Sequence, residues 1–287
     1  MRRWLLRMEA SLSNFEMPWQ LQMFHRSLKK QLKLRALLKQ LGDVSDQDCL
    51  LVTCGDNNGA LNWHFRAQGG NWTWGDVAGE NLSEMSELLG EKVHHLSESQ
   101  FPFADHRFDC LVSIDVLEHL ADDQPFLCEM KRVLRPGGKA IVTVPNGDPS
   151  LLANRIKWRL GMTPEVYGHT RAGYTIDELR VSVSRAGLQP LNSSGYSKFF
   201  TEMMELMINL GYVFILSKGN KVHERGKIAP TSSSEIKKHG GSYRLYTLFY
   251  PIMNWISKLD FLFPERSNGA VILLSLKPGG VYDSSKS

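Results

Sequence analysis

Short apolar runs alternate with helix-patterned segments between Leu50 and Asn146. Each run has the length of a buried strand, and the segments between the runs repeat apolar residues at helical spacing. The predicted strands are 49–53, 72–74, 92–96, 110–114 and 140–144, and the predicted helices are 60–68, 81–89 and 124–134. Strands and helices that alternate over these distances form a parallel sheet with helices on both faces. The pattern therefore predicts an α/β fold with a doubly wound, mostly parallel sheet.

The flanking segments predict further helices on either side of this sheet. Residues 19–41 place leucines near one face and basic residues mostly elsewhere, which is typical of one amphipathic helix that Gly42 ends. Thr175 begins a helix with a capping-box pattern, and 269–276 reads as a final strand. We predict four parts: an N-terminal helical segment (1–46), a cofactor-binding domain (47–190), a helical cap or insertion (191–266) with a flexible basic loop (218–242), and a closing strand and tail (267–287).

The composition is that of an ordinary globular protein, with 42% hydrophobic residues, 22% charged residues and a formal net charge of +4. The four cysteines include no CxxC pair, so we expect reduced thiols, no disulfide framework and no metal site. The sequence shows no secretory signal pattern and no run of the ~18 apolar residues that a spanning helix needs. We therefore expect a cytoplasmic protein, with peripheral contact to the inner membrane face as a further option.

A glycine-bearing turn follows the first predicted strand, between Gly55 and Gly59, and Asp76 ends the second strand. Glycines let the backbone approach a ligand closely, and an acid about 20 residues later is well placed for ribose hydroxyls. The turn predicts a nucleoside-containing cofactor. Taken alone, it is also compatible with a tight strand–helix turn that binds nothing.

Four linked motifs follow in order: FPFADHRFD (101–109), SIDVLEHL (113–120), KRVLRPGG (131–138) and TVPN (143–146). Together with the turn, they resemble the class I S-adenosylmethionine-dependent methyltransferases, and most closely the branch with quinone and other small-molecule methyltransferases. The resemblance covers about residues 48–146, and weaker matches at 168–174 and 186–188 extend it to about residue 190. It implies a Rossmann-like domain, S-adenosyl-L-methionine as the cofactor and methyl transfer as the activity.

The resemblance also implies a role for each matching position at the cofactor. It places Gly55, Asn57 and Gly59 beside the methionine part, Asp76 on the ribose hydroxyls, Ser97 or Glu98 near the adenine, and Ile114 and Asp115 on the methyl-donor side.

Two positions depart from the family pattern. Thr53 stands where the family usually has an acid before the first glycine, and Ser97 replaces a common Asp. Asp56 is a candidate substitute for the missing carboxylate. These departures keep open a second interpretation, a degenerate protein that binds S-adenosylmethionine without catalysis.

Transfer of a methyl group to a hydroxyl requires an aligned acceptor and removal of a proton. The candidate bases are Asp115, Glu118, His119 and His169. We place His119 first because it follows a strand at the carboxyl edge of the sheet, where ligands bind in open α/β folds. The alternative for His119 is a structural role at the start of a turn or helix, and for His169 a solvated loop.

The segments after residue 190 contain Met-rich and aromatic runs at 199–214 and 243–263, with basic residues at 26–39 and 218–238. Such runs form an ordinary core, a lid over an apolar acceptor, or a membrane-surface contact. The basic residues are not interleaved with an aromatic stacking surface, which argues against nucleic acid. We predict methylation of a small-molecule or lipid-like acceptor at oxygen, and a nucleic-acid methyltransferase remains an alternative.

Overall fold

The computed structural model describes residues 17–55, 58–217 and 240–279. It contains a seven-stranded sheet in the order β3-β2-β1-β4-β5-β7-β6. The strands are β1 (Asp48–Thr53), β2 (Asn71–Asp76), β3 (Val93–His95), β4 (Phe108–Ile114), β5 (Leu134–Pro145), β6 (Gln189–Gly195) and β7 (Ala270–Leu276). Strands β1 to β5 pair in parallel, whereas β7 runs antiparallel to both β5 and β6. The predicted doubly wound, mostly parallel Rossmann-like sheet is confirmed.

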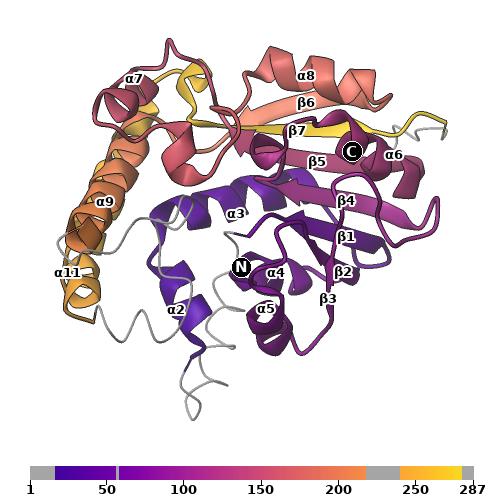
Figure 1. Ribbon diagram of the computed structural model, residues 1–287, viewed down its shortest axis with the longest axis horizontal. Coiled ribbons are helices and arrows are strands. Elements are labelled where there is room, and N and C mark those ends of the chain that lie inside the picture. Colours follow the sequence, from indigo (N-terminus) through magenta and orange to yellow (C-terminus); the bar gives the residue numbers. More distant parts are fainter. Residues whose placement is uncertain (1–16, 56–57, 218–239, 280–287) are drawn as a thin grey trace.

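Helices cover both faces of this sheet (Figure 1). The helices are α2 (Trp19–His25), α3 (Leu28–Leu41), α4 (Ala60–Arg66), α5 (Leu82–Leu89), α6 (Gln124–Val133), α7 (Leu152–Arg159), α8 (Ile176–Arg185), α9 (Phe199–Ser217) and α11 (Gly240–Ser257). Short 3-10 turns are η1 (Leu117–His119), η2 (Pro164–Tyr167), η3 (Lys258–Leu262) and η4 (Glu265–Ser267).

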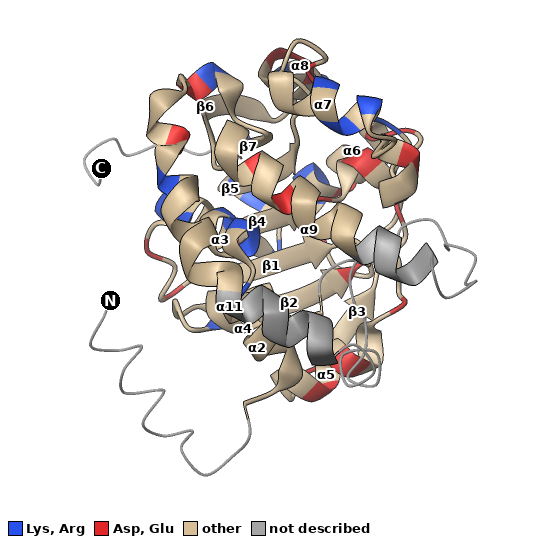
Figure 2. Cartoon of the chain, turned by 90° about the vertical axis from the view of Figure 1, so that its left-hand side faces the viewer, with Lys and Arg blue, Asp and Glu red and all other residues tan. Residues whose placement is uncertain are grey.

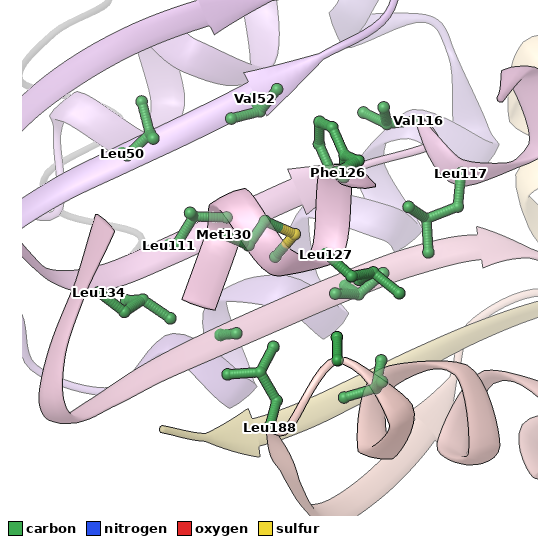
Figure 3. Close-up of a cluster of buried hydrophobic side chains, with 14 of the residues drawn as sticks. Leu50, Val52, Leu111, Val116, Leu117, Phe126, Leu127, Met130, Leu134 and Leu188 are labelled. Carbon is green, nitrogen blue, oxygen red and sulfur yellow. The ribbon is translucent and has the colours of Figure 1, made fainter. Parts of the chain in front are cut away.

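The core consists of two apolar clusters, one on each face of the sheet. Leu50 and Val52 belong to the cluster that α6 and α8 cover, which Figure 3 shows. Cys49 and Leu51 belong to the cluster under α3, α4 and α5. Successive side chains of a strand point to opposite faces. The run of apolar residues in β1 therefore serves both clusters, as expected for a strand buried on both sides.

The predicted helix over 19–41 is two helices, separated at Arg26 and Ser27. The side chain of Gln31 donates to the carbonyl of His25, which satisfies a backbone group at the end of α2. Phe24 packs on His64 of α4, with ring centroids 4.4 Å apart. The break turns α2 onto α4, so tertiary contacts override a continuous helical pattern.

Two further boundaries differ from the prediction. Strand β6 was not predicted, because most of its residues are polar or only partly buried and lack apolar alternation. Residues 136–138, which lie between the predicted helix 124–134 and the predicted strand 140–144, fall within the bounds of β5, beside a register shift against β4. The capping box of α8 is confirmed, since the Glu178 amide donates to the Thr175 hydroxyl and the Thr175 amide to the Glu178 carboxylate.

At one end of the sheet, α9 lies beside both α11 and α3 (Figure 1). Figure 2 faces this end and shows basic positions along α3 next to α9. Most of the basic loop predicted at 218–242 lies outside the described residues. Among the helices of the described ranges, none is long and apolar enough to cross a membrane.

Candidate cofactor and acceptor site

The carboxyl ends of β1 and β2 are joined through the carboxylate of Asp76. The Thr53 hydroxyl donates to Asp76 Oδ2 over 2.6 Å, and the Gly55 amide donates to the same atom over 3.0 Å. The Gly79 amide donates to Oδ1 over 2.8 Å. Asp76 itself is 1% exposed. A single buried carboxylate thus ties the turn after β1 to the turn after β2.

This network bears directly on the predicted ribose contact of Asp76. A carboxylate has about four acceptor positions, and three protein donors already occupy most of them. Two ribose hydroxyls therefore require that at least one of these donors gives way. The contact between Asp76 and ribose stays a prediction.

Backbone geometry explains why glycine occupies positions 55 and 59 of the turn. Gly55 has a φ of +66°, and a Cβ there would stand 3.0 Å from the Cβ of Ala78. Gly59 has a φ of +86° and directly precedes α4. Their places at the sheet edge suit the predicted contact with the methionine part of a cofactor, which no contact here tests. Asp56 and Asn57 lie outside the described residues, so their assigned roles also stay predictions.

An open cleft of about 590 Å³ lies where β3 ends. Ser97 and Glu98 line it, together with Val77, His95, Leu96, Gln100 and Pro102. The Leu96 amide donates to the carbonyl of Asp76, which places the cleft next to the Asp76 network. The predicted contact of Ser97 or Glu98 with adenine falls at this cleft and stays a prediction.

Asp115 follows β4 with a φ of +50°, a backbone conformation that Asp tolerates better than most residues. Its carboxylate forms a buried ion pair with Lys33 of α3. The preceding residue, Ile114, is 2% exposed and its side chain packs in the cluster under α3 to α5. Only the backbone of Ile114 can therefore contact a ligand at the site edge. The Asp115 carboxylate is held in place by Lys33 of α3.

Lys33 was not among the predicted site residues. It lies at four-residue intervals with Leu37 and Leu41, which are both buried. Residues four apart share a helix face, so this spacing was the available signal. A lysine on an amphipathic helix is normally assigned to the solvent face. The pattern therefore does not predict the contact between Lys33 and Asp115.

Glu118, His119 and His169 form a second group near the end of β4. Glu118 and His119 belong to η1, and His169 lies in the loop after η2. The rings of His119 and His169 meet edge to face with centroids 4.8 Å apart. The structure thus brings together two of the predicted catalytic residues, which are far apart in the sequence.

The electrostatics of His169 limit its use as a base. Burial, and then the neighbouring His119, lower the pKa of His169 to about 4, although Asp115 acts in the opposite direction. The imidazole is therefore neutral at pH 7. A general base works best when its pKa is near the working pH. At pH 7, His169 is a weak base but a competent hydrogen-bond acceptor.

A buried charge cluster lies between α3, α7 and α9. Glu202 is fully buried and contacts Lys29, Lys157 and the Ser197 hydroxyl. Burial alone would raise the pKa of Glu202, but Lys157 and Lys29 outweigh it and hold this pKa well below its usual range. The cluster joins α7 and α9 to α3. No local sequence pattern indicates this cluster, because its members are distant in the chain.

Arg171 and Tyr174, in the loop that follows His169, make contacts that stabilise the fold. Tyr174 is buried in the core, and its hydroxyl donates to Asp123 over 2.6 Å. The Arg171 guanidinium lies over the Tyr174 ring, 4.8 Å from its centroid. This loop is therefore anchored to the protein interior on the side next to His169.

Known proteins resemble the part of the chain that contains strands β1 to β5. Residues 50–142 match the family model described as "Methyltransferase domain". The ubiquinone biosynthesis O-methyltransferase of Cereibacter sphaeroides (strain ATCC 17029) is 32% identical over 154 residues, which are 50% of this chain and 62% of that protein. The protein of the same name from strain ATCC 17025 is 27% identical and is covered over 64% of its length. The chain thus spans less than two thirds of these relatives.

Solved structures show the same fold at low identity. Phosphoethanolamine N-methyltransferase 2 of Haemonchus contortus, in complex with S-adenosyl-L-methionine, superposes with a TM-score of 0.52 at 15% identity, covering 86% of this chain and 52% of that one. An S-adenosylmethionine-dependent methyltransferase of Mesorhizobium loti gives a TM-score of 0.51 at 11% identity, covering 85% and 97%. At these identities the likeness shows the fold alone.

Proposed function

We propose that this chain, whose residues 50–142 form a domain of the class I S-adenosylmethionine-dependent methyltransferase family, transfers a methyl group to an oxygen of a small-molecule or lipid-like acceptor. S-adenosyl-L-methionine is the methyl donor of this family. The observation that carries the proposal is that the predicted donor-binding residues and the predicted catalytic residues lie at the same edge of the sheet. The Asp76 network and its cleft lie after β1 to β3, and Asp115, His119 and His169 lie after or beside β4.

In this proposal, each half of the edge has its own task. The turn between Gly55 and Gly59, with Asp76, Ser97 and Glu98, binds the donor, and the Ile114 backbone borders its reactive end. When bound, S-adenosylmethionine supplies an activated methyl group. Asp115 and His169 orient the acceptor hydroxyl, His119 receives its proton, and the Lys33 ion pair holds Asp115 in place.

The surface of the cap supports a lipid-like acceptor and peripheral membrane contact. Large apolar side chains are exposed on α9, α11 and η3: Met207, Phe249, Ile252, Trp255, Phe261 and Leu262. The three on α11 recur at every third position, which places them near one face. Exposed apolar faces of this kind mark lipid or protein contacts.

Calorimetry with S-adenosylmethionine tests the donor site. We expect binding to the intact chain and at least tenfold weaker binding for Asp76→Ala. The control is Asp46→Ala, because Asp46 is exposed and distant from the turn. Thermal melting of each variant separates a lost contact from a lost fold. Unchanged affinity in a folded Asp76→Ala variant would overturn the site assignment.

Labelled methyl uptake tests the acceptor class. The chain is incubated with methyl-labelled S-adenosylmethionine and with the lipid or the polar fraction of a cell extract. We expect label in the lipid fraction. Label in RNA, or donor binding with no transfer to any fraction, would favour the nucleic-acid methyltransferase or the non-catalytic alternative.

A further inference from the structure

The cleft at the end of β3, the edge strand of the sheet, has the size and the walls that a purine base requires (Figure 1). Its volume of about 590 Å³ lies within the range of roughly 300–1,000 Å³ that is typical of ligand pockets. Val77, Leu96 and Pro102 line it with apolar side chains. Because the Leu96 amide donates to the Asp76 carbonyl, the cleft also lies beside the residue predicted to hold the ribose.

A pocket selects adenine through the hydrogen-bonding edge of the base. The 6-amino group of adenine donates a hydrogen bond, whereas the 6-oxo group of a hypoxanthine or guanine only accepts one. The protein must therefore present an acceptor to this edge. Ser97 stands at the position where the family often has an acid, and its hydroxyl already accepts from the Ser99 amide over 3.4 Å. The other side chains of the cleft that can accept belong to His95, Glu98 and Gln100.

The ring of His95 is held by two contacts with the turn after β2. Its Nε2 lies 3.1 Å from the Val77 carbonyl oxygen, and a carbonyl oxygen only accepts hydrogen bonds. Nε2 therefore carries the proton, and in the neutral ring the lone pair is on Nδ1. The ring also lies against Gly79, where a Cβ would stand 2.9 Å from Nε2. These contacts fix both the tautomer and the place of the ring.

His95 is the best-ordered acceptor of the cleft. The side chains of Glu98 and Gln100 are exposed, and within the described residues no side-chain hydrogen bond or ion pair holds either of them. Binding a ligand through such a side chain costs conformational entropy, most of which the tethered ring of His95 has already lost on folding. Among the described residues, no donor occupies Nδ1 of His95. A fixed and available lone pair thus lies at the cleft.

We propose that His95 is the residue that selects the adenine base of the donor, with Nδ1 accepting a hydrogen bond from the 6-amino group. This rests on the proposed donor site and assigns the contact that Ser97 does not supply as a carboxylate. Ser97 and Glu98 then border the base without making this hydrogen bond. A 6-oxo base would turn an acceptor toward the Nδ1 lone pair, so the site should reject it.

Calorimetry with S-adenosylhomocysteine and with its 6-oxo analogue, S-inosylhomocysteine, tests the inference on the full chain. Neither compound has a methyl group to transfer, so the measurement reports binding alone. We expect the intact chain to bind the adenosyl compound at least about tenfold more tightly than the inosyl compound. His95→Phe keeps a flat ring and removes both nitrogens, so its preference should fall below about threefold.

The matched control is His94→Phe, the same substitution at the neighbouring residue. Successive side chains of a strand point to opposite faces, and the His94 ring meets Phe103 edge to face with centroids 5.2 Å apart. Phenylalanine keeps that contact, and the preference for the adenosyl compound should remain that of the intact chain. Both histidines are at least partly exposed, and thermal melting verifies that each variant is folded.

Two results would overturn the inference and leave the donor site standing. One is an equal preference of the intact chain and a folded His95→Phe variant. The other is a preference that Glu98→Gln removes and His95→Phe retains, because Glu98 would then bind the amino group.

The same samples separate the inference from the proposed function. If His95→Phe loses the preference and the intact chain transfers methyl groups to no acceptor fraction, the role of His95 stands and the methyltransferase proposal fails. If neither compound binds to the intact chain, the donor site and the role of His95 fail together.

Discussion

The hydroxyl of Thr53 donates a 2.6 Å hydrogen bond to Oδ2 of Asp76. The two residues are register partners at the ends of β1 and β2. An acid at position 53, which the family pattern usually has, would place a second buried carboxylate against Asp76. Threonine avoids that repulsion and instead holds the Asp76 carboxylate in place. The departure from the family pattern is therefore compatible with an intact donor site.

Replacing Thr53 with Val should weaken binding of S-adenosylmethionine. Valine keeps the shape and removes a hydrogen bond to a charged group, which is worth about 1.5–3 kcal/mol. That figure is a loss of folding stability, which urea unfolding measures. We expect a smaller loss of S-adenosylmethionine affinity by calorimetry, because the Asp76 carboxylate is no longer held in one orientation. Thr53→Ser keeps the hydroxyl and should bind within about threefold of the intact chain. Equal affinities of the Val and Ser variants would show that this hydrogen bond has no part in binding.

Replacing Glu202 with Gln should destabilise the fold by about 3–5 kcal/mol, because it leaves Lys29 and Lys157 buried without their carboxylate. Unfolding in urea measures the change. The matched control is Glu265→Gln, which breaks the pair with Lys198 at a side chain that is 82% exposed. Exposed pairs contribute less than about 1 kcal/mol. Similar losses in both variants would contradict the role given to the buried cluster.

His64 should make the protein less stable at mildly acidic pH. Burial, followed by the charge of His25, lowers the pKa of His64 from 6.5 to about 4. The unfolded chain then binds a proton that the folded chain refuses, so stability falls as the pH drops from about 6.5 to about 4. His64→Phe removes this proton site. Relative to the intact chain, we expect it to gain about 2 kcal/mol on going from pH 7 to pH 5.

The comparison uses urea unfolding of both proteins at both pH values, so that all other titrating groups cancel in the difference. A pH-independent difference between the two proteins would mean that His64 titrates normally in the fold.

Replacing Gly173 with Ala should displace the loop that carries His169. Gly173 has a φ of +111°, and a Cβ there would lie 2.1 Å from the carbonyl oxygen of Pro145. Gly161→Ala is the matched control, since Gly161 has a φ of +81° and nothing within 4 Å of its Cβ. The control should lose about 1 kcal/mol from backbone strain alone. We expect a clearly larger loss for Gly173→Ala in urea unfolding, and equal losses would exclude the contact with Pro145 as the cause.

Much of the fold could be predicted from local pattern. The apolar runs of β1 and β4 are buried on both faces, so their composition identifies them as inner strands of a parallel sheet. The capping box at Thr175 marks the start of α8 because both of its hydrogen bonds are local. Strand β6 escaped prediction because a polar edge strand is defined by its pairing with β7, which the local pattern does not contain.

The sequence by itself determined the alternation of strands and helices, the glycine turn with Asp76, and the motif that contains Asp115 and His119. These depend on neighbours within a few residues or on a regular period. Only the tertiary structure decided that Lys33 pairs with Asp115, that Glu202 joins two lysines, and that His169 meets His119 and Glu118. Those contacts join segments 45 to 173 residues apart. The order of the strands and the packing of the cap bring them together, and no local period in the chain encodes either.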